Sequence, residues 1–598
     1  MSNIEINDTP EWQMDDAYGS LTDDRWLRSK SRVKALTADI ADMLNGEATD
    51  EILTRALSAY EEALTLQSSM WSFAKCLGAK DVTDASSTAA MSMTDDLKHD
   101  LEAAAAPLFA ALAALSEDAA LWQEKPFSHW KFSLRERFGD WHNKLSESDA
   151  SLVSDIELKA FMSLGTIHKS LQKLVDFEAK SASGEAVRVR AAKLIAILKG
   201  DPDPVLRRTT GEAMDDWYRR HADLYAALLN ELHGIRLAGF DRAGVTDPLS
   251  VSLAQNRMSR EALDAIRTAI FNNIGWVREG IRLRAKVLGT GKLGFYDIMA
   301  PAPEAGGGVP RKMSYAEGIA IVKDALGRVN PAMSEFIDMM LEKKWLDARP
   351  SDKKVGGAFY SRFNEFRIPR VFSTYLGSIT AVLQQGHELG HAFHYWTMRD
   401  LPMIETEFPM TLTETASNFN EAVIRKVLLE EARGDERFKM LWQESRSGAN
   451  FLLNTMVRME FELAFLEERR RGVVPAERCC SLMTETWRRW YGEDVTPDTW
   501  LWAHKLHYYK TDQFIYNYPY TVGYLMSQAL MREWEVRGDA FYDFYTAMLR
   551  DTGRMTVDEI IRVHFGADAA DPAFWEGAMQ SVKQSSDDFA RLVAEHNY

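Results

Sequence analysis

The chain has 598 residues, of which 46% are hydrophobic and 27% charged, and its formal net charge at pH 7 is −17. This length and composition are typical of a globular protein that is larger than one small hydrophobic core. The negative charge argues against nucleic acid and anionic membranes as partners, because both bind basic surfaces.

The N-terminus, the longest apolar run and the cysteines bear on the compartment. Residues 1–16 are polar and acidic, without the basic and apolar regions of a secretory signal, so none is expected. The apolar run 103–115 is too short to span a bilayer. Cys76, Cys479 and Cys480 are too few for a disulfide framework and lack the spacing of a zinc site, and we expect a reducing, cytoplasmic location.

Helical periodicity dominates the first part of the chain. Residues 24–118 are rich in Ala, Leu and Glu and are interrupted by turn residues, which predicts helical hairpins. The aromatic residues of 122–138 have irregular spacing, which is typical of a core. Helical patterns continue over 151–199, and a Gly-Asp-Pro-Asp-Pro sequence then interrupts them. We place a domain boundary there, between residues 1–204 and 205–598.

The segment 355–377 differs in composition from the helical segments before it. Aromatic and β-branched residues such as Phe359, Val371 and Phe372 are interleaved with Gly, Ser and Arg, which favours strands over helices. An extended peptide can pair with the exposed edge of a sheet through main-chain hydrogen bonds, so the position of these strands matters for function.

The sequence His387-Glu388-Leu389-Gly390-His391 follows the strand region. Apolar and small residues recur at helical spacing over 378–399, and Ser378 is a plausible N-cap, so we predict an amphipathic helix. Two histidines four residues apart lie on one face of a helix, about 6 Å apart along the axis, and both can bind one metal ion. Glu388 then lies beside the metal, where a carboxylate can take the proton of an attacking water.

The third metal ligand must come from another segment. His394 lies about 10.5 Å along the axis from His387, too far to complete the set. The metzincin pattern is excluded, because it needs Gly at 394 and His at 397, where this chain has His and Thr. The candidates downstream are Glu405, Glu407, Glu414 and Glu421. The first two lie between prolines and are expected on a loop.

Glu414 opens a helical run over 413–433. Thr411 and Glu414 also fit a capping box, in which the glutamate would only close the start of the helix. Asn418 and Glu421 lie on the same helix face, so both are candidates to support a metal ligand at position 414.

Residues 502–524 are unusually dense in tyrosine. Hydrolysis of a peptide bond puts negative charge on the former carbonyl oxygen, and a neutral hydroxyl or imidazole N–H aimed at this oxygen lowers the barrier. For any single tyrosine, a place in an aromatic core is the competing interpretation. The candidates are His504, His507, Tyr508, Tyr509, Tyr516, Tyr518, Tyr520 and Tyr524.

These motifs carry a resemblance to a known family. The sequences Gly-His-Glu-Leu-Gly-His-Ala-Phe-His at 386–394 and Thr-Glu-Thr-Ala-Ser-Asn-Phe-Asn-Glu at 413–421 resemble the oligoendopeptidase F branch of the thimet oligopeptidase family of zinc metallopeptidases. The similarity extends to the segments 356–360, 370–377, 507–509 and 514–524.

The resemblance implies one Zn²⁺ per chain, bound by His387, His391 and Glu414, with a water in the fourth position. It implies that Glu388 is the general base. The fold implied is mainly α, a multi-helical zincin-like metallopeptidase with a small β-sheet beside the zinc helix and a deep substrate groove.

The resemblance also implies roles outside the metal site. Residues 1–204 would be a helical region that covers the groove, and residues 205–598 would form the catalytic zinc-peptidase domain. Further catalytic roles would fall to His507, Tyr516 and Tyr518. The residues implied in substrate binding are Gly357, Ala358, Phe359, Tyr520 and Tyr524.

The expected activity is that of a zinc metalloendopeptidase, which hydrolyses internal bonds of short oligopeptides. Short peptides would be its partners, no nucleic acid or membrane is expected, and the sequence leaves the oligomeric state open. One alternative is a dipeptidyl carboxypeptidase of the same superfamily, which needs a clamp on the free C-terminal carboxylate. Another is a non-catalytic zinc-binding helical protein, which has no need of Glu388.

Overall fold

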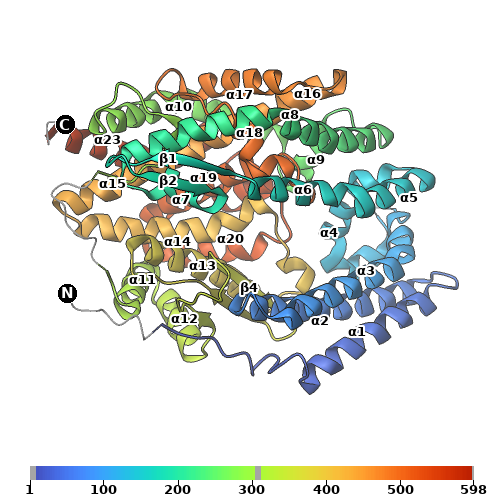
Figure 1. The fold of residues 1–598 in the computed structure, drawn as a ribbon. Coiled ribbons are helices and arrows are strands. Elements are labelled where there is room, and N and C mark those ends of the chain that lie inside the picture. Colours follow the sequence, from blue (N-terminus) through green and yellow to red (C-terminus); the bar gives the residue numbers. More distant parts are fainter. Residues whose placement is uncertain (1–8, 117, 304–311, 596–598) are drawn as a thin grey trace. The chain divides into compact units, whose positions relative to one another are not determined.

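The computed structural model describes residues 9–116, 118–303 and 312–595 of the chain. The first eight residues, which belong to the acidic segment 1–16, lie outside the described residues. Helices make up most of the described chain, and its strands are short (Figure 1). The prediction of a mainly α fold with a small sheet is confirmed.

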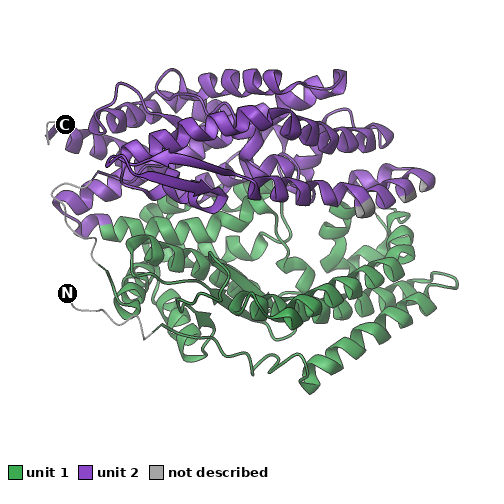
Figure 2. Cartoon of the chain, viewed as in Figure 1, with its two compact units in different colours: residues 1–138, 309–428, 530–565 green, residues 139–308, 429–529, 566–598 purple. Residues whose placement is uncertain are grey.

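The chain divides into two compact units that interleave along the sequence (Figure 2). Unit 1 consists of Met1–Phe138, Val309–Leu428 and Leu530–Phe565. Unit 2 consists of Gly139–Gly308, Leu429–Ala529 and Gly566–Tyr598. Each unit thus draws on three separated stretches of sequence. The domain boundary at residue 204, and the covering of a groove by residues 1–204, stay predictions.

The helices wholly or mainly in unit 1 are α1 (Asp24–Met43), α2 (Asp50–Lys80), α3 (Ala85–Ala113), α4 (Phe127–Gly139), α11 (Tyr315–Val329), α12 (Pro331–Glu342), α13 (Ile379–Met398), α14 (Met410–Glu431), α20 (Phe541–Asp551) and α21 (Val557–Ile560). Its strands are β3 (Leu346–Asp347), β4 (Phe359–Phe363) and β5 (Ile368–Phe372).

The helices wholly or mainly in unit 2 are α5 (Glu147–Ile156), α6 (Met162–Lys173), α7 (Ala191–Gly200), α8 (Pro204–Arg242), α9 (Pro248–Gln255), α10 (Arg260–Val287), α15 (Gly434–Ala449), α16 (Thr455–Arg471), α17 (Ala476–Tyr491), α18 (Leu501–His504), α19 (Tyr518–Arg537), α22 (Pro572–Ala578) and α23 (Gln580–Glu595). Its strands are β1 (Asp176–Lys180) and β2 (Ala186–Arg190).

The N-terminal helices of unit 1 begin at capping side chains and pack through apolar faces. Asp23 and Thr49 each accept a hydrogen bond from a main-chain N–H in the first turn of α1 and α2. Trp122, Phe127 and Trp130 belong to a buried cluster with residues of α1, α2 and α3. The assignment of these three aromatic side chains to a core is confirmed.

A three-stranded sheet lies in unit 1, and two of its strands fall in the segment 355–377, where strands were expected. β5 is the central strand, since it pairs with β4 in antiparallel and with β3 in parallel orientation. β4 is therefore an edge strand of the sheet. An edge strand presents main-chain N–H and C=O groups that can pair with another chain.

The segment before α1 is bonded to this sheet. The Ala348 N–H donates to Pro10 O at 2.9 Å. Asp16 accepts hydrogen bonds from Trp345 Nε1, at 2.6 Å, and from Arg370. These two partners lie 329 and 354 positions after Asp16 in the sequence. The start of the described chain thus supports the sheet that carries β4.

α13 and α14 pack at close range. The Ser378 Oγ accepts a hydrogen bond from Ala381 N–H at 3.1 Å, which confirms the predicted N-cap of α13. A Cβ at position 390 would lie 2.7 Å from Ala416 O and 2.7 Å from Ser417 Cα, so only glycine fits there. Because the backbones of α13 and α14 lie so close together at Gly390, side chains of the two helices can converge on one site.

Gly390→Ala is expected to destabilise unit 1 by about 1–3 kcal/mol, because the added methyl group meets helix backbone rather than a flexible side chain. Denaturation followed by circular dichroism measures the change. Gly275→Ala is the matched control, since Gly275 also lies inside a helix but has open space around it. That control should gain about 1 kcal/mol from helix propensity. Equal effects of the two substitutions would contradict the close packing of α13 on α14.

Unit 2 contains a β-hairpin that was not expected. Helix was predicted over 151–199, but β1 and β2 pair antiparallel within this segment. β1 alternates exposed and buried residues, and this period of two is that of a strand. Gly184, with φ at +82°, supplies a left-handed residue in the connecting turn. The prediction of helix is therefore wrong at residues 176–190.

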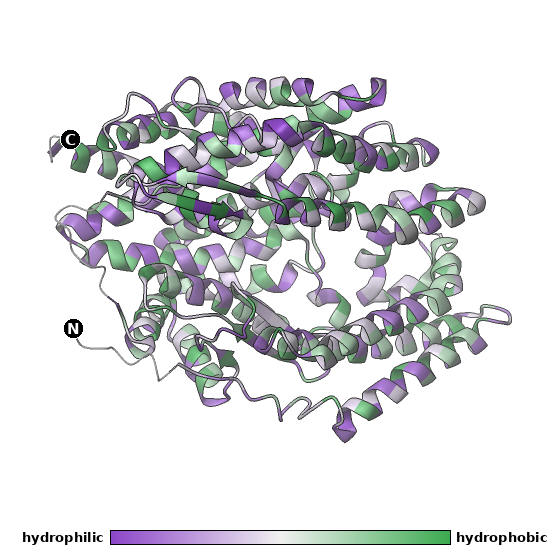
Figure 3. Ribbon diagram, viewed as in Figure 1, coloured by the Kyte–Doolittle hydropathy of each residue, from purple (hydrophilic) through white to green (hydrophobic). Residues whose placement is uncertain are grey.

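Most helices are amphipathic, with hydrophobic and hydrophilic residues interspersed along each of them (Figure 3). Their apolar sides meet in buried clusters, such as Phe438, Trp442 and Phe589 in unit 2. Within residues 9–116, 118–303 and 312–595, no helix has both the length and the apolar character that crossing a membrane requires.

Candidate active site

α13 and α14 bring three candidate metal ligands together. His387 Nε2 lies 3.3 Å, and His391 Nε2 lies 3.7 Å, from Glu414 Oε2. One ligand atom from each of the three residues lies within 4.8 Å of the other two. Two imidazoles and one carboxylate form the donor set of a catalytic zinc site, which keeps its fourth position open. The three side chains therefore fit a zinc ion.

The electrostatics of this group favour a positive charge among the ligands. Burial lowers the pKa of His387, but hydrogen bonds to Glu414 and Glu421 outweigh it and raise this pKa to about 10. Burial raises the pKa of Glu414, but the hydrogen bond with His387 and the charges of both histidines outweigh it and lower this pKa to about 2. Burial lowers the pKa of His391 to about 4, so this imidazole is neutral and available as a ligand. A bound metal ion takes the place of the His387 proton.

Glu421 holds His387 on the side away from the other ligands. Glu421 Oε1 lies 2.7 Å from His387 Nδ1, and the other Glu421 oxygen accepts a hydrogen bond from Arg425. A carboxylate on the distal nitrogen fixes the ring and the tautomer of a metal-binding histidine. Asn418, the other candidate for support, makes no hydrogen bond to these side chains in the described part of the chain.

Glu421→Gln is expected to lower the affinity for zinc about 10- to 100-fold, because an amide holds the imidazole less strongly than a carboxylate does. Titration with zinc against a competing chelator measures the affinity. Glu430→Gln is the control, since Glu430 lies on the same helix but is exposed. If the Glu421 variant bound zinc as tightly as the Glu430 variant, the role of Glu421 would be disproved.

Glu388 lies beside the ligands and is 6% exposed. Burial raises the pKa of Glu388 to about 7, while the charge of His387 acts in the opposite direction. A bound dication lowers the pKa of a neighbouring carboxyl group, so Glu388 ionises more readily when metal is present. No hydrogen bond joins the Glu388 carboxylate to another described residue, which leaves its oxygens available to water.

Two sequence-based alternatives at this site are resolved by the structure. His394 Nε2 lies 2.8 Å from Thr552 Oγ1, so this side chain faces the end of α20 and is held there. α14 begins at Met410, which puts Thr411 inside the helix instead of at its N-cap. The capping-box interpretation of Glu414 is therefore wrong.

Glu405 and Glu407 form ion pairs outside the metal ligands. Glu405 Oε2 lies 3.6 Å from Arg554 Nη1, and the Glu407 carboxylate pairs with Arg362. A short 3₁₀ turn, Met403–Thr406, occupies the stretch between prolines, where a loop was expected. Neither glutamate competes with Glu414 as a ligand.

A cavity of about 810 Å³ lies beside β4 in unit 1. The Tyr360 ring lines this cavity and stacks on His391, with 5.5 Å between the ring centroids. Thr413, which precedes the ligand Glu414, also lines it. Residues of α2, α3, α4 and the segment 403–408 complete the walls. The cavity therefore lies along the edge strand, and Tyr360 and Thr413 separate it from the metal ligands, which do not line it.

The segment implied in substrate binding leads into β4. Gly357 has φ at +96° and, with Ala358, precedes the strand. The Phe359 ring stacks on Phe372 at 4.9 Å, and Lys75 Nζ lies 4.2 Å from the centre of the Phe359 ring. The Phe359 side chain is therefore occupied by contacts within unit 1, and its role toward a substrate stays a prediction.

His507, Tyr516 and Tyr520 form an aromatic cluster in unit 2. The centroid of the His507 ring lies 5.4 Å from that of Tyr516 and 5.6 Å from that of Tyr520, and all three side chains are half-buried. Tyr518 is fully buried, and its hydroxyl accepts a hydrogen bond from Ser252 Oγ at 3.2 Å. Tyr516 and Tyr520 thus lie in a different environment from Tyr518.

Tyr524 is also buried, and its ring stacks on Phe451 with 4.7 Å between the centroids. All of these tyrosines, and His507, belong to unit 2, whereas the metal ligands belong to unit 1. Their roles toward a substrate stay predictions.

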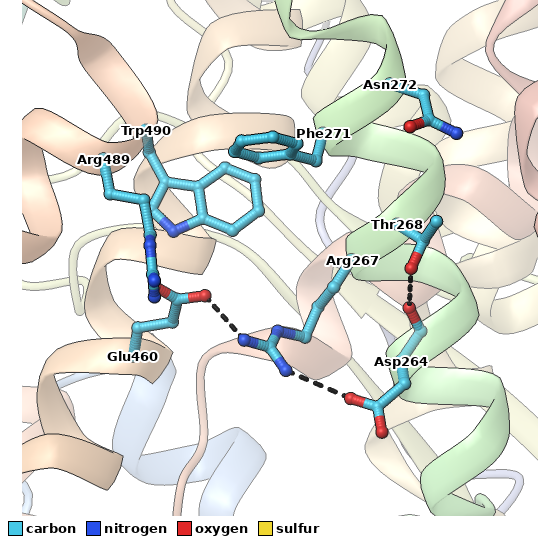
Figure 4. Close-up of a pocket in the computed structure, with 8 residues that line it drawn as sticks. All are labelled: Asp264, Arg267, Thr268, Phe271, Asn272, Glu460, Arg489 and Trp490. Carbon is cyan, nitrogen blue, oxygen red and sulfur yellow. Dashed lines mark hydrogen bonds and ion pairs between the residues drawn. The ribbon is translucent and has the colours of Figure 1, made fainter.

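A second cavity, of about 430 Å³, is lined by α10, α16 and α17 in unit 2 (Figure 4). Arg267 bonds to Glu460 at 2.8 Å and to Asp264 at 3.1 Å. Arg489 bonds to the same Glu460 at 3.1 Å. Two arginines thus face two carboxylates, and the lining contains neither histidine nor cysteine. We assign this cavity no chemistry.

Sequence reasoning assigned no role to Arg425 and Lys75, which lie near the metal site, and placed Tyr360 only within the segment expected to form strands. Arg425 follows Glu421 by four residues, the spacing of a helical ion pair, so a pattern was available. Tyr360 lies within the segment 356–360, which carries the family resemblance. Lys75 comes from α2 and has no local signal in the sequence.

Comparisons with known proteins agree with these observations. A family profile described as Peptidase family M3 matches residues 197–581. The Oligoendopeptidase F homolog of Lactococcus lactis subsp. lactis (strain IL1403) is 23% identical over 424 residues, which cover 67% of this chain and 68% of that protein. Oligopeptidase PepF of Bacillus subtilis (strain 168) is 20% identical over 612 residues, which cover 99% of this chain and 88% of that protein.

Solved structures share the fold. Oligoendopeptidase-F from Enterococcus faecium has a TM-score of 0.69 at 16% identity, over 95% of this chain and 98% of that chain. PZ peptidase A, solved with an inhibitor, has a TM-score of 0.72 at 16% identity, over 93% and 97% of the two chains. The mainly α fold and the resemblance to the oligoendopeptidase F branch are confirmed. Because the profile of peptidase family M3 matches more than half of this chain, the chain belongs to that family and is a metallopeptidase.

Proposed function

We propose that the protein is a zinc metalloendopeptidase that hydrolyses internal bonds of short peptides. The observation that carries this proposal is the convergence of His387, His391 and Glu414 beside Glu388, next to a cavity lined by the edge strand β4. The names of the relatives, oligoendopeptidase and oligopeptidase, support the substrate class.

Zinc would be held by the Nε2 atoms of His387 and His391 and by the carboxylate of Glu414. When bound, the ion acts as a Lewis acid that polarises the scissile carbonyl and makes water more acidic. His387 must lose its extra proton to act as a ligand, and Glu421 then accepts the hydrogen bond from its Nδ1–H. The carboxylates of Glu414 and Glu421 offset most of the positive charge that the zinc ion adds.

Glu388 is the proposed general base. Its carboxylate takes a proton from the attacking water and later delivers it to the nitrogen of the leaving amine. Its position next to His387 on α13, and the absence of a hydrogen-bond partner among the described residues, support this role. A purely structural zinc site has no use for a buried carboxylate at this position.

The substrate peptide is proposed to lie along β4 as an added strand. β4 has a partner on one side only within its sheet, and its residues Tyr360, Ser361 and Arg362 line the cavity. Main-chain pairing holds a peptide without reading its side chains. Gly357, Ala358 and Phe359 would contribute at the start of this strand.

Stabilisation of the negatively charged carbonyl oxygen is proposed for the segment that contains His507, Tyr516 and Tyr518, with Tyr520 and Tyr524 in contact with substrate. The half-buried rings of Tyr516 and Tyr520 beside His507 give these two tyrosines the strongest support. The hydroxyl of Tyr518 is already bonded to Ser252, which supports a structural contribution from that residue.

A fluorogenic peptide of about eight residues, blocked at both ends, tests the proposed function together with an assay for bound zinc. Cleavage at an internal bond by the zinc-loaded protein is the expected result. Cleavage of the same peptide only when its C-terminus is free would instead establish a dipeptidyl carboxypeptidase. Failure to cleave either peptide, with zinc bound, would favour a non-catalytic zinc protein.

A further inference from the structure

Lys75, on α2, lies against the edge strand β4. Its Nζ lies 4.2 Å from the centre of the Phe359 ring and 5.4 Å from the centre of the Trp71 ring. The faces of aromatic rings attract a cation, so the two rings hold the ammonium group in place. Lys75 and Trp71 also line the cavity of about 810 Å³ beside β4. Because the Lys75 side chain is only half-buried, a molecule in this cavity can reach its ammonium group.

The ammonium group of Lys75 has no anionic partner. Within the described ranges of the chain, Lys75 forms no ion pair and donates no hydrogen bond. A lysine ammonium has three N–H donors. Burial lowers the pKa of Lys75 from its ordinary value, and the charge of Glu388 counteracts this only in part. A carboxylate placed beside Lys75 would accept its donors and favour its charged form.

The other cationic side chains that line the cavity are ion-paired or exposed. Arg137 bonds to a glutamate at 2.7 Å, and Arg362 pairs with Glu407. Lys98 is exposed, and solvent weakens the ion pairs of such a side chain. Among the described lining residues, Lys75 is therefore the cation that is both partly buried and unpaired.

β4 presents its side chains alternately to α2 and to α13. Phe363 belongs to a buried cluster with residues of α2, and Phe359 faces Lys75 of the same helix. Tyr360, which follows Phe359, stacks its ring on His391 of α13. This alternation is that of any strand, whose successive side chains point to opposite faces of the sheet. Lys75 and the metal ligand His391 thus lie on opposite faces of β4.

A peptide paired with the free edge of β4 would continue this alternation. Directly opposite residues of two paired strands have Cβ atoms about 5 Å apart, on the same face of the sheet. The peptide residue opposite Phe359 would therefore direct its side chain to the α2 face, beside Lys75. All of these groups belong to unit 1.

We propose that Lys75 binds a carboxylate of the substrate, carried by an aspartate or glutamate at one position of the peptide, and that it is a specificity-determining residue. The proposal rests on the proposed function, since it needs a peptide along β4. The net charge of −17 gives an acidic peptide no general attraction to the protein, so a local cation determines whether an acidic side chain is accepted. A free C-terminus carries the same chemical group, and peptides with a blocked C-terminus distinguish the two sources.

Peptides of about eight residues, blocked at both ends, test the contact. Glutamate and glutamine are compared at each position in turn. At one position the wild type is expected to cleave the glutamate peptide with a kcat/KM about tenfold higher, the effect of one charge-assisted hydrogen bond at a half-buried site. Equal values at every position would overturn the proposal. A carboxylate preference that needs a free C-terminus would also overturn it, because the bound group would then be the terminal carboxylate.

Lys75→Met is expected to abolish the preference for glutamate at this position. Methionine keeps an unbranched side chain over the two rings but carries no charge. Lys75→Arg keeps the charge and should still prefer glutamate. Lys98→Met is the matched control, because it removes an equal charge from the same cavity and should keep the wild-type ratio of the two kcat/KM values. Loss of the preference in Lys98→Met as well, or its survival in Lys75→Met, would contradict the assignment to Lys75.

Binding without turnover separates this proposal from the proposed function. Fluorescence anisotropy of the labelled glutamate and glutamine peptides measures their Kd values for the zinc-loaded Glu388→Gln chain, with and without Lys75→Met. Tighter binding of the glutamate peptide that depends on Lys75 would support the contact even if the wild type cleaved no peptide, and only the proposed function would then fail. Cleavage by the wild type, combined with equal affinities for the two peptides at every position, would overturn the contact and leave the peptidase function intact. Binding of neither peptide would overturn both.

Discussion

Glu388→Gln is expected to lower kcat for a blocked peptide of about eight residues roughly a thousandfold while the protein keeps its zinc. Glutamine has the shape of glutamate but cannot take a proton from water. The three ligands lie on other positions of α13 and α14, so metal content should not change. Single-turnover kinetics and a zinc assay on the same preparation measure both quantities.

Glu405→Gln is the matched control for this substitution. Glu405 is a buried glutamate of unit 1 that pairs with Arg554 and does not contact the ligands. The Glu405→Gln substitution should leave kcat unchanged. Because Glu388 is buried without a hydrogen-bond partner among the described residues, its replacement by a neutral amide should not lower the melting temperature either. Near-normal turnover by zinc-loaded Glu388→Gln would rule out Glu388 as the base.

Loss of the metal is expected to abolish peptide cleavage entirely. Dialysis against a chelator should remove the activity, and added zinc should restore it. The metal should also stabilise the fold by about 4 kcal/mol at a zinc concentration a thousand times the dissociation constant, because it binds only the folded site. Thermal unfolding with and without zinc measures this stabilisation independently of catalysis.

Two histidines on α13 provide a sharp comparison for the same prediction. His391→Gln removes a ligand and should lose bound zinc, whereas His394→Gln removes a buried hydrogen bond to Thr552 and should keep it. Both variants are expected to be less stable than the wild type, so stability alone does not distinguish them. Equal zinc content in the two variants would contradict the ligand set.

The helix that carries the metal ligands was predictable because its pattern is local. Ser378, the apolar spacing of 378–399 and the interval between His387 and His391 all lie within one element, and the structure has α13 where they indicate. Glu414 required more, since four glutamates fitted the local patterns and the family resemblance singled one out. The reason for its position, the fit of Gly390 against Ala416, depends on two helices at once.

Contacts between distant segments were beyond the sequence. The stacking of Tyr360 on His391 depends on the register of β4 against β5, which no local pattern specifies. The hydrogen bond from Ile515 N–H to Glu462 Oε1 joins the segment before α19 to α16. The hairpin at 176–190 is a different case, because its alternation was present in the sequence and was outweighed by helical patterns on both sides.

During synthesis on the ribosome, α13, which carries His387 and His391, is made before the segment at the end of α20 that packs against it. His394 of α13 is bonded to Thr552, which is synthesised 158 residues later. Contacts of such long range form late, because the intervening chain must first be ordered. We therefore expect the metal site to bind zinc firmly only after the segment that contains Thr552 has left the ribosome. The protein is then not an active peptidase at earlier stages of its synthesis.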